Sequence, residues 1–124
     1  MNTVMTRRHV ATGLALVACA LVLALPLRGA AQNERPQIVH TIVIDAASFE
    51  PKFLRANIGD RIVWVNKDLL VHTATAKRGT FDSKEIPAGK SWSYTAAAAG
   101  QLDYKCSLHP TMKGTLLVAA TPRP

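Results

Sequence analysis

Short runs of β-branched and aromatic residues, divided by turn residues, fill the chain from residue 38 to residue 119. Glycine, proline and aspartate mark the divisions, for example at Gly59-Asp60 and at Pro87-Ala88-Gly89. The pattern predicts strands over residues 38–46, 61–66, 71–76, 91–96, 101–106 and 115–119. Short strands with a turn about every 8 to 12 residues are typical of an all-β fold, and we expect an antiparallel sandwich or barrel.

Two of these runs alternate between apolar and polar residues, which indicates that one face of each strand is buried. Trp92 and Tyr94 alternate with serine and threonine, and Tyr104 and Cys106 alternate with charged residues. Because successive side chains of a strand point to opposite faces, we assign the aromatic residues to the core. Cys106 then ends its strand with the sulfur pointing into the protein.

The first 31 residues have the pattern of a secretory signal peptide. Arg7 and Arg8 precede an apolar run over residues 10–25, and small residues follow up to Ala31, after which we expect cleavage. The run of about 16 residues is shorter than the roughly 20 that span a bilayer, which favours a cleaved signal over a permanent anchor. Two alternatives stay open, a twin-arginine signal at Arg7-Arg8 and attachment of a lipid at Cys19. We therefore expect a periplasmic protein that contacts the membrane only if this segment is retained or lipidated.

The length of 124 residues allows one small domain. We expect an export signal over residues 1–31, a flexible lead-in over 32–37, a folded domain over 38–120 and a tail over 121–124. Without the export signal, the chain carries 12 basic and 8 acidic side chains, a net charge of +4, and no basic run. These figures leave no room for a second catalytic domain and argue against nucleic-acid binding, so we expect a monomer that is not an enzyme.

Cys106 is the one cysteine outside the predicted signal, so it has no disulfide partner in an oxidising compartment. The chain continues as Cys106-Ser107-Leu108-His109-Pro110-Thr111-Met112, which spaces a thiolate, an imidazole and a thioether three residues apart. On a straight strand the first two would lie roughly 10 Å apart, too far to share a small ion. A tight loop, stiffened by its proline, brings the three side chains together. The spacing of these three residues therefore predicts a metal site. The alternative is that Cys106 is a buried, inert cysteine.

Another ligand has to come from elsewhere in the chain, and the rest of the predicted domain offers two histidines. His40 lies within the first strand, where we expect an exposed or half-buried side chain. His72 follows the loop over residues 66–70, and because ligands can converge at loop ends it is the better candidate. Two imidazoles, a thiolate and a weak axial thioether form the ligand set of blue copper sites, whereas a structural zinc site has no use for methionine. The predicted ligands of one copper ion are His72, Cys106, His109 and Met112.

Two segments of the chain carry recognisable motifs. The first is Gly59-Asp60-Arg61-Ile62-Val63-Trp64-Val65-Asn66, followed by His72, and the second is Tyr104-Lys105 followed by the run from Cys106 to Met112. Both resemble the motifs of the cupredoxins, the small blue copper proteins, and are most similar to those of amicyanins and plastocyanins. The two residues between His109 and Met112 match the short amicyanin-type loop, since plastocyanins have four residues there. The resemblance covers nearly all of residues 38–120. It implies a Greek-key β-sandwich of about eight strands, one type 1 copper ion and transfer of single electrons between redox proteins.

The resemblance also implies a role for each candidate ligand. His72 and Cys106 would be buried ligands, and Met112 would be the long axial ligand. The ring edge of His109 would reach the surface through an apolar patch, where redox partners dock and electrons enter and leave. The candidates for this patch, which could equally be partly buried loop packing, are Leu69, Leu70, Leu108 and Pro110.

Thr73 departs from the family pattern. Many relatives carry asparagine after the first histidine, where its side chain links the two ligand loops. A Thr73 hydroxyl that bonds near Ser107 would serve the same purpose. The sequence leaves open whether it does.

A copper carrier or buffer that delivers the metal itself is the alternative function, because the same soft ligands serve both purposes. A delivery protein tends to present exposed clusters of methionine and histidine, whereas Met112 is the single methionine after the predicted signal, so we favour electron transfer. Copper oxidases and nitrite reductases need further copper centres. Three histidines after the signal are too few to build them.

Overall fold

The computed structural model describes residues 35–120. The predicted export signal with its cleavage site after Ala31, the start of the lead-in and the tail over 121–124 lie outside the described residues. Within residues 35–120, no helix has the length and apolar character needed to cross a membrane.

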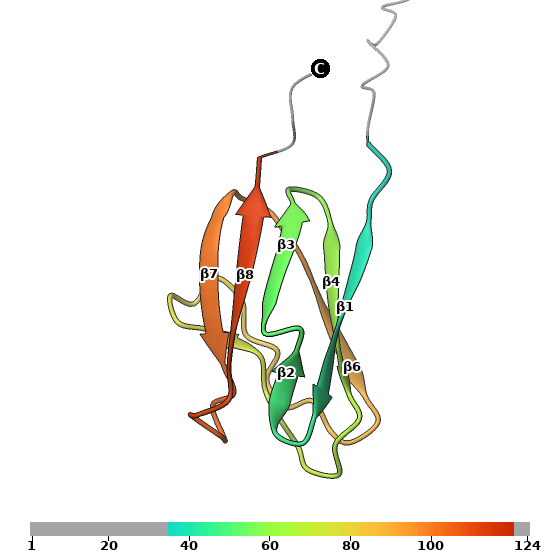
Figure 1. The fold of residues 1–124 in the computed structure, drawn as a ribbon, viewed down its shortest axis with the longest axis vertical. Coiled ribbons are helices and arrows are strands. Elements are labelled where there is room, and N and C mark those ends of the chain that lie inside the picture. The colour runs from blue at the N-terminus through green and yellow to red at the C-terminus, as the bar shows by residue number, and fades with distance from the viewer. Residues whose placement is uncertain (1–34, 121–124) are drawn as a thin grey trace, which may run out of the picture. The chain divides into compact units, whose positions relative to one another are not determined.

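Eight strands form two four-stranded sheets that pack as a sandwich (Figure 1). This arrangement confirms the predicted all-β sandwich of about eight strands. The strands are β1 (Val39–Asp45), β2 (Ser48–Glu50), β3 (Phe53–Asn57), β4 (Arg61–Asn66), β5 (Thr75–Ala76), β6 (Ser91–Thr95), β7 (Gly100–Lys105) and β8 (Lys113–Ala119).

The pairing within the sheets is mixed, so the antiparallel part of the prediction of an antiparallel sandwich or barrel is wrong. One sheet has the order β2-β1-β4-β6 and the other β3-β8-β7-β5. The pairs β1–β4 and β3–β8 are parallel, and the other four pairs are antiparallel. The chain crosses from the first sheet to the second between β2 and β3 and returns with β4. Because of these crossings, β4 lies beside β1 and runs in the same direction. Alternation of side chains is the same in both kinds of pairing, so the sequence pattern did not distinguish them.

Most predicted strands lie within a residue or two of the observed ones, but the run over residues 71–76 does not. There only Thr75 and Ala76 form a strand, while His72 makes an isolated antiparallel bridge to Ile86. The two bridge residues exchange backbone hydrogen bonds of 3.2 and 2.7 Å. His72 therefore pairs with a loop residue and not with a strand, and three residues later the chain pairs with β7. The pattern also missed β2 and β3, which are short and flank Pro51.

The core between the sheets is aromatic at its centre. Trp64 and Tyr104 are fully buried, and their rings meet edge to face with centroids 5.5 Å apart. Trp92 and Tyr94 are partly buried and pack against this core, as the alternation predicted. Gly114 lies opposite Tyr104 in the β7–β8 pair, and a methyl group there would come within 2.3 Å of the tyrosine ring. The close packing of Tyr104 against β8 therefore requires glycine at this position.

Candidate metal centre

The four predicted ligands lie on two loops at one end of the sandwich. His72 follows β4, Cys106 directly follows β7, and His109 and Met112 lie in the short loop that leads into β8. In Figure 1 the strand ends that carry these loops, those of β4 and β7 and the start of β8, lie at the lower end of the sandwich. His72, Cys106 and Met112 are buried, and His109 is half-buried.

The sulfur and two imidazole nitrogens converge on one point. The donor atoms of His72, Cys106 and His109 all lie within 4.8 Å of one another. Cys106 Sγ is 3.9 Å from Nδ1 of His72 and 3.7 Å from Nδ1 of His109. Donor atoms that share an ion through bonds of about 2.0 to 2.3 Å are separated by distances of this size. The three side chains can therefore hold one ion between them.

The ring of His72 is oriented by a carboxylate on its far side. Its Nε2 lies 3.0 Å from Oδ2 of Asp68, so Nδ1 is the nitrogen that faces Cys106. Asp68 also accepts hydrogen bonds from the backbone amides of Ala47 and Leu69, at 3.0 and 2.7 Å. The Ala47 amide, the His72 ring and the Leu69 amide together lower the pKa of Asp68 to about 2. The carboxylate is therefore ionised at neutral pH, and it fixes the ring as such partners fix metal-binding histidines.

The loop before His72 is held by Asn66. Its side-chain amide donates to the carbonyls of Leu70 and Ile86, at 2.8 and 2.9 Å, and its carbonyl oxygen accepts from the amide of Asp68. The side chain of Asn66 is completely buried. Neither this role of Asn66 nor that of Asp68 was predicted from the sequence. An aspartate four residues before a candidate ligand was the available signal, but in a loop that spacing does not place two side chains together.

The loop from Cys106 to Met112 closes on itself. The Cys106 amide donates to the Met112 carbonyl at 3.0 Å, and the Met112 amide donates to the His109 carbonyl at 2.9 Å. The sulfur of Cys106 also accepts a hydrogen bond of 3.3 Å from the amide of Thr73. The loop from Cys106 to Met112 is therefore tight, as predicted. The backbone amide of Thr73, in the other ligand loop, supports the thiolate directly.

The hydroxyl of Thr73 connects the two ligand loops. Its oxygen accepts a hydrogen bond of 2.8 Å from the amide of Ser107 and lies 3.0 Å from the hydroxyl of Thr75. The hydroxyl of Ser107 donates to the same Thr75 oxygen at 3.2 Å. The threonine thus makes the link that the sequence analysis left open.

Several apolar residues of the two ligand loops are exposed. Three leucines are exposed, Leu69 by 91%, Leu70 by 55% and Leu108 by 48%, and Pro110 is exposed as well. Partly buried loop packing, the alternative reading of these residues, does not describe them. His40 is half-buried, as expected, and pairs with Asp60 rather than with the other two histidines.

The donors present suit copper. One thiolate and two imidazoles accept both Cu(I) and Cu(II), and the loops that carry them are fixed by hydrogen bonds to a rigid sandwich. The residues of this centre fit one type 1 copper ion.

Comparisons with known proteins agree with this geometry. Amicyanin of Paracoccus denitrificans is 31% identical over 88 residues, which cover 62% of this chain and 64% of that protein. Amicyanin-alpha of Methylorubrum extorquens is 28% identical over 93 residues, or 71% of this chain and 78% of that protein. The chain thus spans slightly less than two thirds of the first relative and more of the second.

Solved structures show the same fold. An oxidised variant of amicyanin has a TM-score of 0.61 at 26% identity, over 67% of this chain and 82% of that one. A purple cupredoxin from Nitrosopumilus maritimus has a TM-score of 0.60 at 23% identity, over 64% of this chain and 99% of that one. A family model described as the cupredoxin-like domain matches residues 14–118, which is most of the sequence. The chain belongs to the cupredoxin-like family.

Proposed function

We propose that the protein binds one copper ion and carries single electrons between redox proteins, with His72, Cys106, His109 and Met112 as ligands. The observation that carries the proposal is the convergence of one sulfur and two imidazole nitrogens within 4.8 Å. Bound copper would supply reversible one-electron chemistry. The protein's part is to hold the donors in one arrangement for both oxidation states, and no catalytic step is required of it.

Several hydrogen bonds support this rigid arrangement. Asp68 holds the ring of His72, and the amide of Thr73 holds the sulfur of Cys106. Met112 is the proposed weak fourth ligand because it is buried and its backbone bonds to Cys106 and His109. Little movement of the loops then accompanies a change of charge, which favours fast electron transfer over tight preference for one state.

Electrons enter and leave at the His109 edge in this proposal. Of the three residues with converging donors, His72 and Cys106 are completely buried, and His109 is the one with an exposed part. The exposed leucines at positions 69, 70 and 108 lie on the two ligand loops and would supply apolar surface that a partner can cover without breaking hydrogen bonds. Redox proteins that dock there would come close to the metal.

Burial also argues for electron transfer over metal delivery. A copper carrier has to release its ion to the next protein, and a thiolate with no exposed surface is hard for another protein's ligands to reach.

We further propose that the protein is exported to the periplasm through the segment over residues 1–31.

The test is the visible spectrum of the copper-loaded protein. We expect an intense thiolate-to-copper band that Cys106→Ser abolishes and that Ser107→Ala, a change to the exposed neighbour, leaves in place. Met112→Leu should keep the band and raise the reduction potential, because a weak donor to the metal is lost. A colourless Cu(II) complex would overturn the proposal, and an unchanged potential would remove Met112 from the ligand set.

A further inference from the structure

Two lysines face each other directly across the β7–β8 pair. Lys105 and Lys113 are register partners, and their chain neighbours Tyr104 and Gly114 are buried, so both lysines point to the outer face of the sheet. Like charges opposite each other on one face of a sheet destabilise it. This arrangement opposes folding, and a negatively charged partner would relieve it.

More lysines extend this surface. Lys52 and Lys77 line a hollow of about 390 Å³ together with Lys113 and Asp103. We call Lys52, Lys77, Lys105 and Lys113 the lysine cluster. Among residues 35–120, no ion pair involves Lys52, Lys105 or Lys113. Most of the positive charge of the cluster is therefore not neutralised by the described part of the chain.

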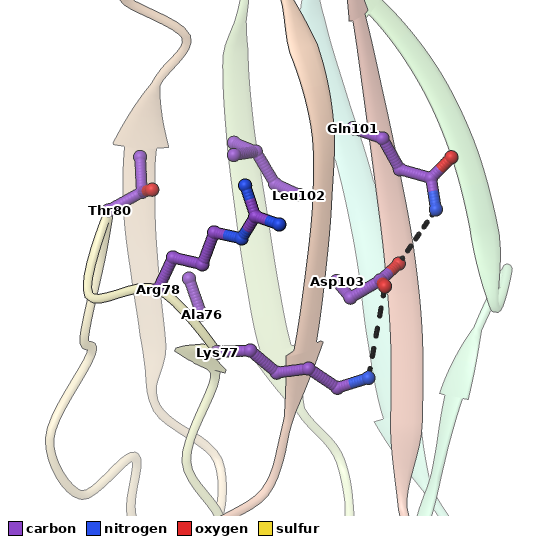
Figure 2. Close-up of a pocket in the computed structure, with 7 residues that line it drawn as sticks. All are labelled: Ala76, Lys77, Arg78, Thr80, Gln101, Leu102 and Asp103. Carbon is purple, nitrogen blue, oxygen red and sulfur yellow. Dashed lines mark hydrogen bonds and ion pairs between the residues drawn. The ribbon is translucent and has the colours of Figure 1, made fainter.

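Asp103, the acidic residue beside the lysine cluster, already has hydrogen-bonding and charged partners. Asp103 lies 3.8 Å from the amine of Lys77 and accepts hydrogen bonds from Gln101 and Thr115, at 3.1 and 3.0 Å. Figure 2 shows the first two of these contacts, with the side chains of Lys77 and Gln101 both directed at Asp103. Arg78 lies in the neighbouring hollow and adds a further positive charge. The surface is thus strongly basic but interrupted at one point.

The lysine cluster borders the metal centre. Lys105 precedes Cys106, and Lys113 follows Met112, so the two ends of the ligand loop carry the facing lysines. The other sheet has no comparable surface among its described strands. There the exposed charges are Arg61, Asp45 and Glu50, which nearly balance. The strands that flank the ligand loop therefore carry facing lysines, and the described strands of the other sheet contain no lysine.

We propose that the lysine cluster docks an acidic redox protein, whose surface carboxylates lie against Lys105 and Lys113 beside the copper loop. The proposal rests on the electron-transfer function and names the chemistry of the partner. A continuous negative surface, such as a membrane or a phosphodiester backbone, would place charge against Asp103. A folded protein has discrete carboxylates that match the lysines and avoid the aspartate, which is the usual basis of charge complementarity. Steering of this kind depends on salt concentration.

The test uses hexa-aspartate as a probe of known charge and measures its binding to the purified, copper-loaded protein by amide chemical shifts. We expect the largest shifts at the ends of β7 and β8 and a loss of binding in high salt. Lys105→Gln/Lys113→Gln should weaken binding about fivefold, since two surface charges are removed. The matched control, Arg61→Gln/Lys90→Gln, removes two exposed charges from the other sheet and its loops and should change binding less than about twofold.

Three outcomes would overturn the proposal. The first is an equal loss of binding in the two double variants. The second is a spread of the shifts over all the basic residues. The third is tighter binding of phosphatidylglycerol vesicles or of a single-stranded oligonucleotide than of hexa-aspartate at equal charge. The copper band of each variant is recorded on the same sample, and the lysines are not ligands, so the band should persist. A missing band in the parent protein would remove the proposed function. An intact band without a selective loss of binding would remove the lysine cluster proposal alone.

Discussion

The two ends of the sandwich each hold a histidine paired with a carboxylate, and the two pairs are built in opposite ways. At the metal centre, His72 is buried and the side chain of Asp68 is 18% exposed. At the other end of β4, Asp60 is buried and the side chain of His40 is 22% exposed. The distances are nearly equal, 3.0 and 2.9 Å. What differs is which partner has lost its water, and that determines what each pair does.

A buried carboxylate needs several donors, and Asp60 has them. It accepts hydrogen bonds from Arg35, His40 and the amide of Asn57, and a longer one from the amide of Ile38. Burial alone would raise the pKa of Asp60, but these hydrogen bonds outweigh it and hold the pKa well below its ordinary value. Asp60 thus ties the start of β1 to the turn before β4, which is a structural role.

A buried histidine with an outer carboxylate has one nitrogen fixed and the other available. Asp68 occupies Nε2 of His72, and Nδ1 is left facing the sulfur of Cys106. The pair therefore prepares a ligand. We therefore expect removal of the Asp60 carboxylate to lower the stability of the fold, and removal of the Asp68 carboxylate to change the metal site.

The largest effect should come from Asp60→Ala. The substitution leaves Arg35, His40 and two backbone amides without their acceptor, and breaking a buried charge pair typically costs about 3 to 5 kcal/mol in the free energy of unfolding. Urea denaturation measures it. Glu85→Ala, at an exposed carboxylate, is the control and should change stability by less than about 0.5 kcal/mol. Equal losses in the two variants would show that the Asp60 network is not structural.

Acid should remove much of the same stabilisation. The pKa of Asp60 is lowered in the folded protein, so its contribution is fully present above the unfolded value of about 3.9 and is lost as pH falls through the folded value. The free energy of unfolding of the parent protein should therefore fall more steeply below about pH 4 than that of Asp60→Asn. Parallel pH profiles for the two proteins would contradict this assignment.

Asp68→Ala should change the metal site more than the fold. Loss of the partner that orients a histidine ligand typically lowers metal affinity about 10-fold to 100-fold. A competition titration with a Cu(I) chelator measures the affinity, and Asp82→Ala, at an exposed carboxylate, serves as the control. If Asp68→Ala binds copper like the parent protein, the ring of His72 is held by packing alone.

The smallest effect is expected for Thr73→Val, which removes a neutral link instead of a charged one. The amide of Ser107 loses its acceptor, and a lost hydrogen bond of this kind typically costs about 0.5 to 1.5 kcal/mol. The visible band should shift slightly and persist. Thr41→Val, at an exposed position of β1, controls for the change of side chain. A loss of the band would mean that the hydroxyl holds the copper loop together.

The comparison also explains what the sequence could predict. Most of the strands, the buried aromatic residues and the four candidate ligands follow from side-chain chemistry and local spacing, which the chain displays directly. The roles of Asp60 and Asp68 depend on which partner folding buries, and an aspartate near a histidine looks the same in both cases. The parallel pairs and β3 were missed because they depend on contacts between distant segments. β2 pairs with its chain neighbour β1 and was missed because a run of three residues shows no clear pattern.

The parallel pairing of β3 with β8 has a consequence for the order of events during folding. Phe53 pairs with Thr115, about 60 residues later, and β8 is the last of the strands among residues 35–120. Contacts between such distant segments form slowly because a long loop has to close first. The strand that follows the ligand loop therefore finds its place only after the chain has been synthesised as far as Ala119. A chain that has not yet reached β8 lacks the strand that fixes one end of the ligand loop, so copper would be bound after β8 has paired and not before.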